Sequence, residues 1–157
     1  MRVLAIDPGY DRLGMAVMDK INNQEKLVYS CCVETSKKDT VAKRIHQIGE
    51  VFEKLILKYK PDIVAMETLF FSKNQKTAMA VAETRGVITF LATRNSLEVR
   101  EFGPGEIKVA VTGYGSSDKR AVMEMLKRLV PNLPPKALDD EYDAIAVAVT
   151  ALAHSRD

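Results

Sequence analysis

The chain has 157 residues, of which 46% are hydrophobic and 28% charged, and its net charge is +2. Glycine and proline are too sparse for a disordered or fibrous protein, so we expect one compact domain over residues 1–157. No apolar run reaches the ~18 residues that a membrane span requires, and the first residues lack the apolar segment of a secretory signal. These features predict a cytoplasmic protein.

The first half of the chain predicts an antiparallel start followed by a crossover. Hydrophobic alternation and turn signals indicate three successive strands, at residues 3–7, 14–19 and 27–35. Thr40 can then cap a helix with apolar residues at the 3.6-residue period, and a short strand follows at 62–66. Because a helix separates this strand from the first, the two can pair in parallel.

The second half predicts more helix than strand. A helix is expected at 75–93, a strand at 97–102, and helices at 104–112, at 118–130 and from Asp139 or Asp140 onward. This order predicts an α/β fold with a mixed five-stranded sheet flanked by helices. Small residues in the 75–93 helix would let another backbone approach, either a second helix of this protein or the same helix of a second copy.

Two predicted strands end in a carboxylate that their own pattern does not explain. Alternation places Asp7 on the same strand face as Val3 and Ala5, and Glu67 on the same face as Ile63 and Ala65. The carboxyl ends of strands are where open α/β sheets bind their ligands. We therefore expect Asp7 and Glu67 to lie at one functional edge.

Two further acids, Asp140 and Asp143, are three residues apart and hence neighbours on one face of the last helix. Four converging carboxylates repel one another unless cations lie among them. Oxygen-only ligands suit Mg²⁺, with Mn²⁺ able to substitute. Two such ions could activate a water on one side of a phosphodiester and stabilise the leaving oxygen on the other, so we predict a metal-dependent site formed by Asp7, Glu67, Asp140 and Asp143.

Most of these acids also have a structural interpretation. Asp7 could form the turn before Pro8, and Asp140 with Asp143 could be a capping box at a helix start. Glu67 has no turn chemistry to justify it. The joint occurrence of the four acids favours the metal site.

Basic and aromatic residues of the middle segment are candidates for DNA binding. Residues 73–128 hold ten Lys and Arg against six Asp and Glu, a balance of +4. Phe70 and Lys73 follow Glu67, while Lys108, Lys119 and Arg120 flank a glycine-rich loop. The alternatives are that the phenylalanine belongs to the core and that the basic residues only form a solvated face.

Several motifs in order resemble the RuvC family, the bacterial Holliday-junction resolvases. They are Ile6-Asp7-Pro8-Gly9 with Gly14, Met66-Glu67 with Phe70 and Lys73-Asn74, Thr84-Arg85-Gly86, Gly113 to Gly115 with Lys119, and Asp140-Glu141-Tyr142-Asp143-Ala144. The resemblance implies a ribonuclease H-like fold and a homodimer. It also implies a magnesium-dependent endonuclease that nicks two strands of like polarity across a four-way DNA junction, in recombination and repair.

By the same resemblance, Asp7, Glu67, Asp140 and Asp143 would be the metal ligands. Phe70 would be the ring that stacks at the junction centre, and Lys108 and Lys119 would meet DNA near the scissile phosphate. RuvA and RuvB, the branch-migration proteins, are implied as partners.

The last motif departs from the family pattern, in which small residues commonly separate the two acids. Here Glu141 and Tyr142 stand between them, and Asp139 adds another acid, so Asp139 or Glu141 could share a metal. Three other functions remain open: an ATP-binding actin-like domain, which Asp7-Pro8-Gly9 also resembles, a junction-binding module without catalysis, and a related nuclease acting on RNA.

Overall fold

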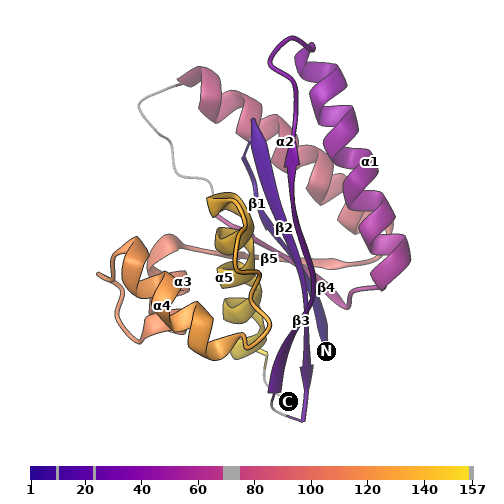
Figure 1. The fold of residues 1–157 in the computed structure, drawn as a ribbon. Helices are drawn as coiled ribbons and strands as arrows, with labels where there is room; N and C mark the ends of the chain where they lie inside the picture. The colour runs from indigo at the N-terminus through magenta and orange to yellow at the C-terminus, as the bar shows by residue number, and fades with distance from the viewer. Residues whose placement is uncertain (10, 23, 69–74, 156–157) are drawn as a thin grey trace.

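A mixed sheet of five strands forms the centre of the computed structural model, which describes residues 1–9, 11–22, 24–68 and 75–155 (Figure 1). The strands are β1 (Arg2–Asp7), β2 (Arg12–Ile21), β3 (Gln24–Glu34), β4 (Ile63–Glu67) and β5 (Glu98–Phe102). The helices are α1 (Val41–Tyr59), α2 (Gln75–Arg94), α3 (Pro104–Thr112), α4 (Lys119–Leu129) and α5 (Asp139–Ala153).

The strand order in the sheet is β3-β2-β1-β4-β5. β1 pairs antiparallel with β2 and parallel with β4, so the predicted hairpin and the predicted crossover are both confirmed. β2 and β3 extend beyond the predicted strands because they pair with each other as far as Ile21 and Gln24, where the sequence pattern had already faded. Thr40 caps α1 as predicted, since its hydroxyl accepts a hydrogen bond from the backbone N–H of Lys43.

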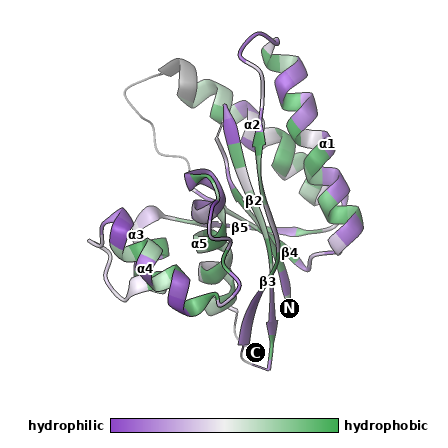
Figure 2. Cartoon of the chain, in the orientation of Figure 1, coloured by the Kyte–Doolittle hydropathy of each residue, from purple (hydrophilic) through white to green (hydrophobic). Residues whose placement is uncertain are grey.

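Helices cover both faces of the sheet. α1 and α2 pack on one face over Leu4, Ile6 and Met66, whereas α5, supported by α3 and α4, packs on the other face over Val3 and Ala5 (Figure 1). Figure 2 shows that α1 carries hydrophobic and hydrophilic residues in alternation, as expected of a helix with one buried side. None of the helices within the described residues is long and apolar enough to cross a lipid bilayer.

Strand alternation brings the acids of β1 and β4 to the α5 side. Ile6 pairs with Met66, so Asp7 and Glu67 follow at the adjacent ends of two parallel strands. Both follow the alternation that directs Val3, Ala5, Ile63 and Ala65 toward α5. The predicted face of these two carboxylates is thus confirmed.

Candidate active site

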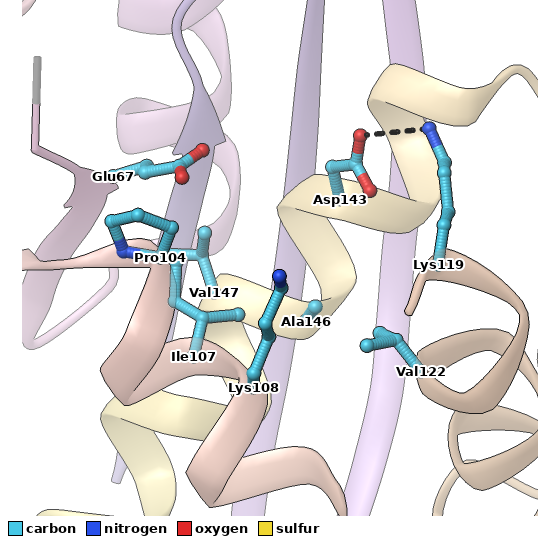
Figure 3. Close-up of a pocket in the computed structure, with 9 residues that line it drawn as sticks. All are labelled: Glu67, Pro104, Ile107, Lys108, Lys119, Val122, Asp143, Ala146 and Val147. Carbon is cyan, nitrogen blue, oxygen red and sulfur yellow. Dashed lines mark hydrogen bonds and ion pairs between the residues drawn. The ribbon is translucent and has the colours of Figure 1, made fainter. Parts of the chain in front are cut away.

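A cavity of about 250 Å³ lies where the carboxyl end of β4 meets α3, α4 and α5. Figure 3 shows Glu67 and Asp143 on opposite sides of this cavity, with the side chain of Lys108 pointing toward the space between them. Lys119 lies beside Asp143, and their side chains form an ion pair with an Nζ–Oδ2 distance of 3.4 Å. Two acids and two lysines predicted from separate parts of the sequence therefore meet in one cavity.

Asp7 lies beside this cavity and is electrostatically coupled to its acids. Burial raises the pKa of Asp7 to about 7, and the charges of Asp143, Glu67 and Asp140 add to the increase. Its part in the turn before Pro8 is a backbone contact, since its carbonyl accepts a hydrogen bond from the N–H of Gly9 at 2.9 Å. Because the turn uses only the backbone of Asp7, its carboxylate remains available to bind a metal ion.

Glu67 and Asp143 respond to the same environment. Burial raises the pKa of both groups, and the charge of Asp143 raises that of Glu67 further. Basic neighbours act in the opposite direction: Arg85 and Lys108 lower the pKa of Glu67, and Lys119 lowers that of Asp143. The site is therefore a cluster of repelling acids that is only partly compensated by nearby cations.

Asp140 is held next to β2 by an unusually close backbone approach. A Cβ atom on Gly14 would lie 1.8 Å from the carbonyl oxygen of Asp140, so only glycine fits there. The carboxylate of Asp140 points toward Arg12, whose Nε lies 3.2 Å from Oδ2. This oxygen is buried, yet it accepts no hydrogen bond from any residue that the structure describes, so the contact with Arg12 is an ion pair without hydrogen-bond geometry.

The residues that depart from the family motif have structural partners. Ser30 of β3 donates a hydrogen bond of 2.5 Å to Glu141. The Tyr142 hydroxyl donates to the carbonyl of Pro134 at 2.6 Å and thereby fixes the start of α5 against the preceding segment. Asp139 is exposed and pairs with Lys119 at 3.1 Å. Glu141 and Tyr142 are thus engaged by residues outside the cavity, and Asp140 and Asp143 are the α5 acids whose charges raise the pKa of Asp7.

The capping-box interpretation of the α5 acids is wrong. Leu138 is the N-cap of α5 and makes no side-chain hydrogen bond to the helix. Asp140 lies in the first turn and so has a favourable interaction with the helix dipole, but it does not cap.

The predicted basic residues divide into two groups. Lys108 and Lys119 line the cavity, whereas Arg120 is exposed on the first turn of α4 and does not line it. Phe70 and Lys73 lie outside the described residues, so their predicted contacts with DNA remain predictions.

Two arginines beside the acids were not assigned a role from the sequence. Arg12 faces Asp140, and Arg85 donates a hydrogen bond to the backbone carbonyl of Glu67. Arg85 lies within Thr84-Arg85-Gly86, a motif that carried the family resemblance without a function. For Arg12 the sequence held no signal, because its partner is 128 positions away in the chain.

The four carboxylates are the type of ligand that a hard divalent cation prefers, although they do not form a close cluster. The carboxylates of Asp7, Glu67 and Asp143, whose pKa values are raised by burial and mutual repulsion, fit Mg²⁺ or Mn²⁺. So does the buried oxygen of Asp140, which is ion-paired with Arg12 but accepts no hydrogen bond from a described residue. In the part of the chain that the structure describes, no three Asp, Glu, His or Cys side chains are close enough to form a metal-binding cluster. The four acids are thus chemically suited to metal ions, and two of them, Glu67 and Asp143, line the cavity.

Comparisons with known proteins agree over nearly the whole chain. The family model for crossover junction endodeoxyribonuclease RuvC matches residues 3–151. The protein of that name from Rickettsia bellii (strain RML369-C) is 40% identical over 152 residues, which cover 97% of each chain. Its counterpart from Finegoldia magna is 42% identical over 150 residues, covering 95% of this chain and 91% of the relative.

A solved structure is also closely similar. The structure of Thermus thermophilus RuvC in complex with a Holliday junction substrate has a TM-score of 0.91 and 26% identity, covering 98% of this chain and 94% of that one. This similarity confirms the ribonuclease H-like fold, with its mixed five-stranded sheet between helices. The chain belongs to the RuvC family of crossover junction endodeoxyribonucleases.

Proposed function

We propose that residues 1–157 form one nuclease domain that resolves four-way DNA junctions by paired, symmetric nicks in strands of like polarity. The observation that carries the proposal is the coupling of Asp7, Glu67 and Asp143 beside a cavity that also holds Lys108 and Lys119. The junction complex of the Thermus thermophilus relative supports this choice of substrate. Family membership, more than the geometry of the turn at Asp7, argues against an ATP-binding domain.

Nucleases of the RuvC family depend on metal ions, and we propose Mg²⁺, two per site, with Mn²⁺ able to substitute. Asp7, Glu67, Asp140 and Asp143 would hold them. When bound, the ions would activate the attacking water and stabilise the leaving oxygen of the phosphodiester. Bound cations would also offset the repulsion that raises the pKa of Asp7.

The lysines would act on the DNA backbone. Lys108 points into the cavity between two acids and would offer its ammonium to a phosphate oxygen (Figure 3). Lys119 is paired with Asp139 and Asp143, and a phosphate arriving at the cavity would share this ammonium group. Phe70 would stack at the junction centre, while Lys73 and Arg120 would contact phosphates farther from the cut.

A homodimer is the proposed assembly, because two sites on one two-fold axis match a nearly two-fold junction. An apolar groove between α1 and α2 supports it, with a volume of about 560 Å³ and Val41, Ile45 and Gly86 among its lining residues. Phe90 lines the groove with 63% of its surface exposed, and Met79 on the same helix is 66% exposed. Large apolar side chains exposed on one helix favour contact with a second copy.

Other partners follow from the family. RuvA and RuvB would deliver the junction by branch migration, and action on chromosomal junctions would place the protein in the bacterial cytoplasm.

A substrate panel tests the proposal. A mobile four-way junction, a linear duplex of the same sequence and an RNA/DNA hybrid are each incubated with the protein in Mg²⁺ or in chelator. We expect symmetric nicks in the junction alone, and only with Mg²⁺. Equal cutting of duplex or hybrid would refute the junction specificity, and cutting in chelator would refute the metal requirement.

A further inference from the structure

Arg85 connects three elements at the base of the candidate site. Its side chain, only 11% exposed, donates a hydrogen bond to the backbone carbonyl of Glu67 at the end of β4. A second nitrogen of the same guanidinium lies 2.9 Å from Oε2 of Glu101 in β5. A residue of α2 thus fastens two neighbouring strand ends.

The backbone carbonyl of Glu67 lies at the last residue of β4, where regular strand pairing ends. β4 ends at Glu67, and the next residue is tied to β5 by a hydrogen bond of 2.9 Å from the N–H of Thr68 to the carbonyl of Phe102. The peptide unit between Glu67 and Thr68 is therefore held at both of its polar groups: its N–H by β5 and its carbonyl by Arg85 of α2. The direction of the Glu67 side chain depends on that peptide unit.

An arginine suits this task better than a lysine would. Its planar fork presents several N–H donors in fixed directions, so it can bond a carbonyl and a carboxylate at the same time. Glu101 neutralises the arginine and holds it in place, and it is itself 45% exposed. Loss of either contact would leave the guanidinium free to rotate away from Glu67.

We propose that Arg85, anchored by Glu101, is a positioning residue that fixes the orientation of Glu67 for metal binding. This inference rests on the proposed function, in which Glu67 is a metal ligand. The alternative is that the Arg85 contacts only stabilise the fold.

Metal affinity separates the two roles, because a contact that only stabilises the fold would lower the melting temperature without changing metal binding. We would measure the binding of Mn²⁺ to the DNA-free protein by electron paramagnetic resonance, and the Mg²⁺ dependence of single-turnover junction cleavage. Arg85→Gln should weaken Mn²⁺ binding and raise the Mg²⁺ concentration for half-maximal rate by about threefold to tenfold. Saturating Mg²⁺ should restore most of the rate.

Graded variants sharpen the test. Arg85→Lys keeps one donor and should show an intermediate shift of about twofold to threefold, and Glu101→Gln should shift metal affinity in the same direction by a smaller amount. Arg100→Gln is the matched control: it breaks another arginine–glutamate pair on β5, with Glu98, and should leave metal affinity unchanged. If Arg85→Gln does not fold, Arg85→Lys decides the question.

The results also separate this inference from the function on which it depends. Wild-type Mn²⁺ affinity and Mg²⁺ dependence in folded Arg85→Gln and Arg85→Lys would overturn the positioning role. If Glu67→Gln weakens metal binding while these variants do not, only the positioning role fails. If Glu67→Gln itself binds Mn²⁺ as the wild type does, Glu67 is not a ligand and both proposals fail.

Discussion

Gly14 and Asp140 touch through their backbones, so that a Cβ on Gly14 would lie 1.8 Å from the Asp140 carbonyl oxygen. No flexible side chain can yield at this contact, because the obstructing atoms are the carbonyl group of Asp140 and the N–H nitrogen of Glu141. β2 and the first turn of α5 therefore pack backbone against backbone. The position of the α5 acids depends on the absence of a side chain at Gly14.

Gly14→Ala should accordingly be severely destabilising. The added methyl group would push α5 away from β2, and we expect a loss of about 3 kcal/mol or more in the free energy of unfolding, measured by urea denaturation. Gly105→Ala is the control, because a Cβ there meets nothing within 4 Å. It should be neutral or stabilise the protein by about 0.5–1 kcal/mol. Equal stability of the Gly14→Ala and Gly105→Ala variants would contradict the close approach.

The raised pKa of Asp7 predicts how stability depends on pH without metal. Burial and neighbouring acids raise its pKa from 3.8 to about 7, so the folded state keeps a proton that the unfolded state loses. Its contribution to stability is complete below pH 4 and is lost as the pH rises to 7.

Asp7→Asn removes the ionisation that destabilises the folded state at high pH. It should make the metal-free protein more stable than the wild type at pH 8 by about 2 kcal/mol. Because other carboxylates titrate in both proteins, the quantity to measure is the difference between their urea-unfolding free energies in chelator, from pH 4 to pH 8. If this difference in unfolding free energy does not change between pH 4 and pH 8, the pKa of Asp7 is not raised in the folded protein.

Phe70→Ala tests the proposed stacking role of a residue outside the described part of the chain. If the ring acts on DNA, the variant should cleave junctions about fivefold to a hundredfold more slowly, as expected from loss of a base-stacking interaction of about 1–3 kcal/mol. Its melting temperature should stay close to that of the wild type. A large fall in melting temperature would instead assign Phe70 to the core.

Phe90→Glu tests the proposed dimer. A charge in the apolar groove between α1 and α2 should shift the protein toward a monomer in sedimentation experiments and replace paired nicks by single ones. Leu57→Glu is the control, since Leu57 is 65% exposed on α1 and does not line the groove. Unchanged sedimentation of Phe90→Glu would place the interface elsewhere.

Much of this fold was predictable because its signals are local. Alternation in β1 and β4 is short and regular, and it correctly gave the sheet face of Asp7 and Glu67. The meeting of Asp7 and Glu67 at one edge followed from a general rule, that parallel strands present their carboxyl ends at the same edge of a sheet. No comparable rule placed Asp143, which lies on α5, and its convergence with the strand acids was a hypothesis based on their joint occurrence. The ends of β2 and β3 were missed, since pairing between two strands prolongs both beyond their own patterns.

The surroundings of the acids were harder to predict. Arg12 reaches Asp140, and Arg85 reaches both Glu67 and Glu101, through contacts that exist only after the elements pack. A single charged residue leaves no periodic trace in a sequence. The role of Tyr142 was equally hidden, because its hydroxyl bonds to a backbone carbonyl that any residue could supply.

The central claim is that carboxylates from β1, β4 and α5 hold divalent cations that cut a four-way junction. Junction binding and junction cleavage by Asp7→Asn, measured side by side with the wild type in Mg²⁺, test it most directly. We predict binding within about twofold of the wild type, since the basic residues are untouched, and cleavage reduced by at least about a hundredfold, as a lost ligand would cost at least about 2.7 kcal/mol of barrier. Cleavage at the wild-type rate would contradict the claim.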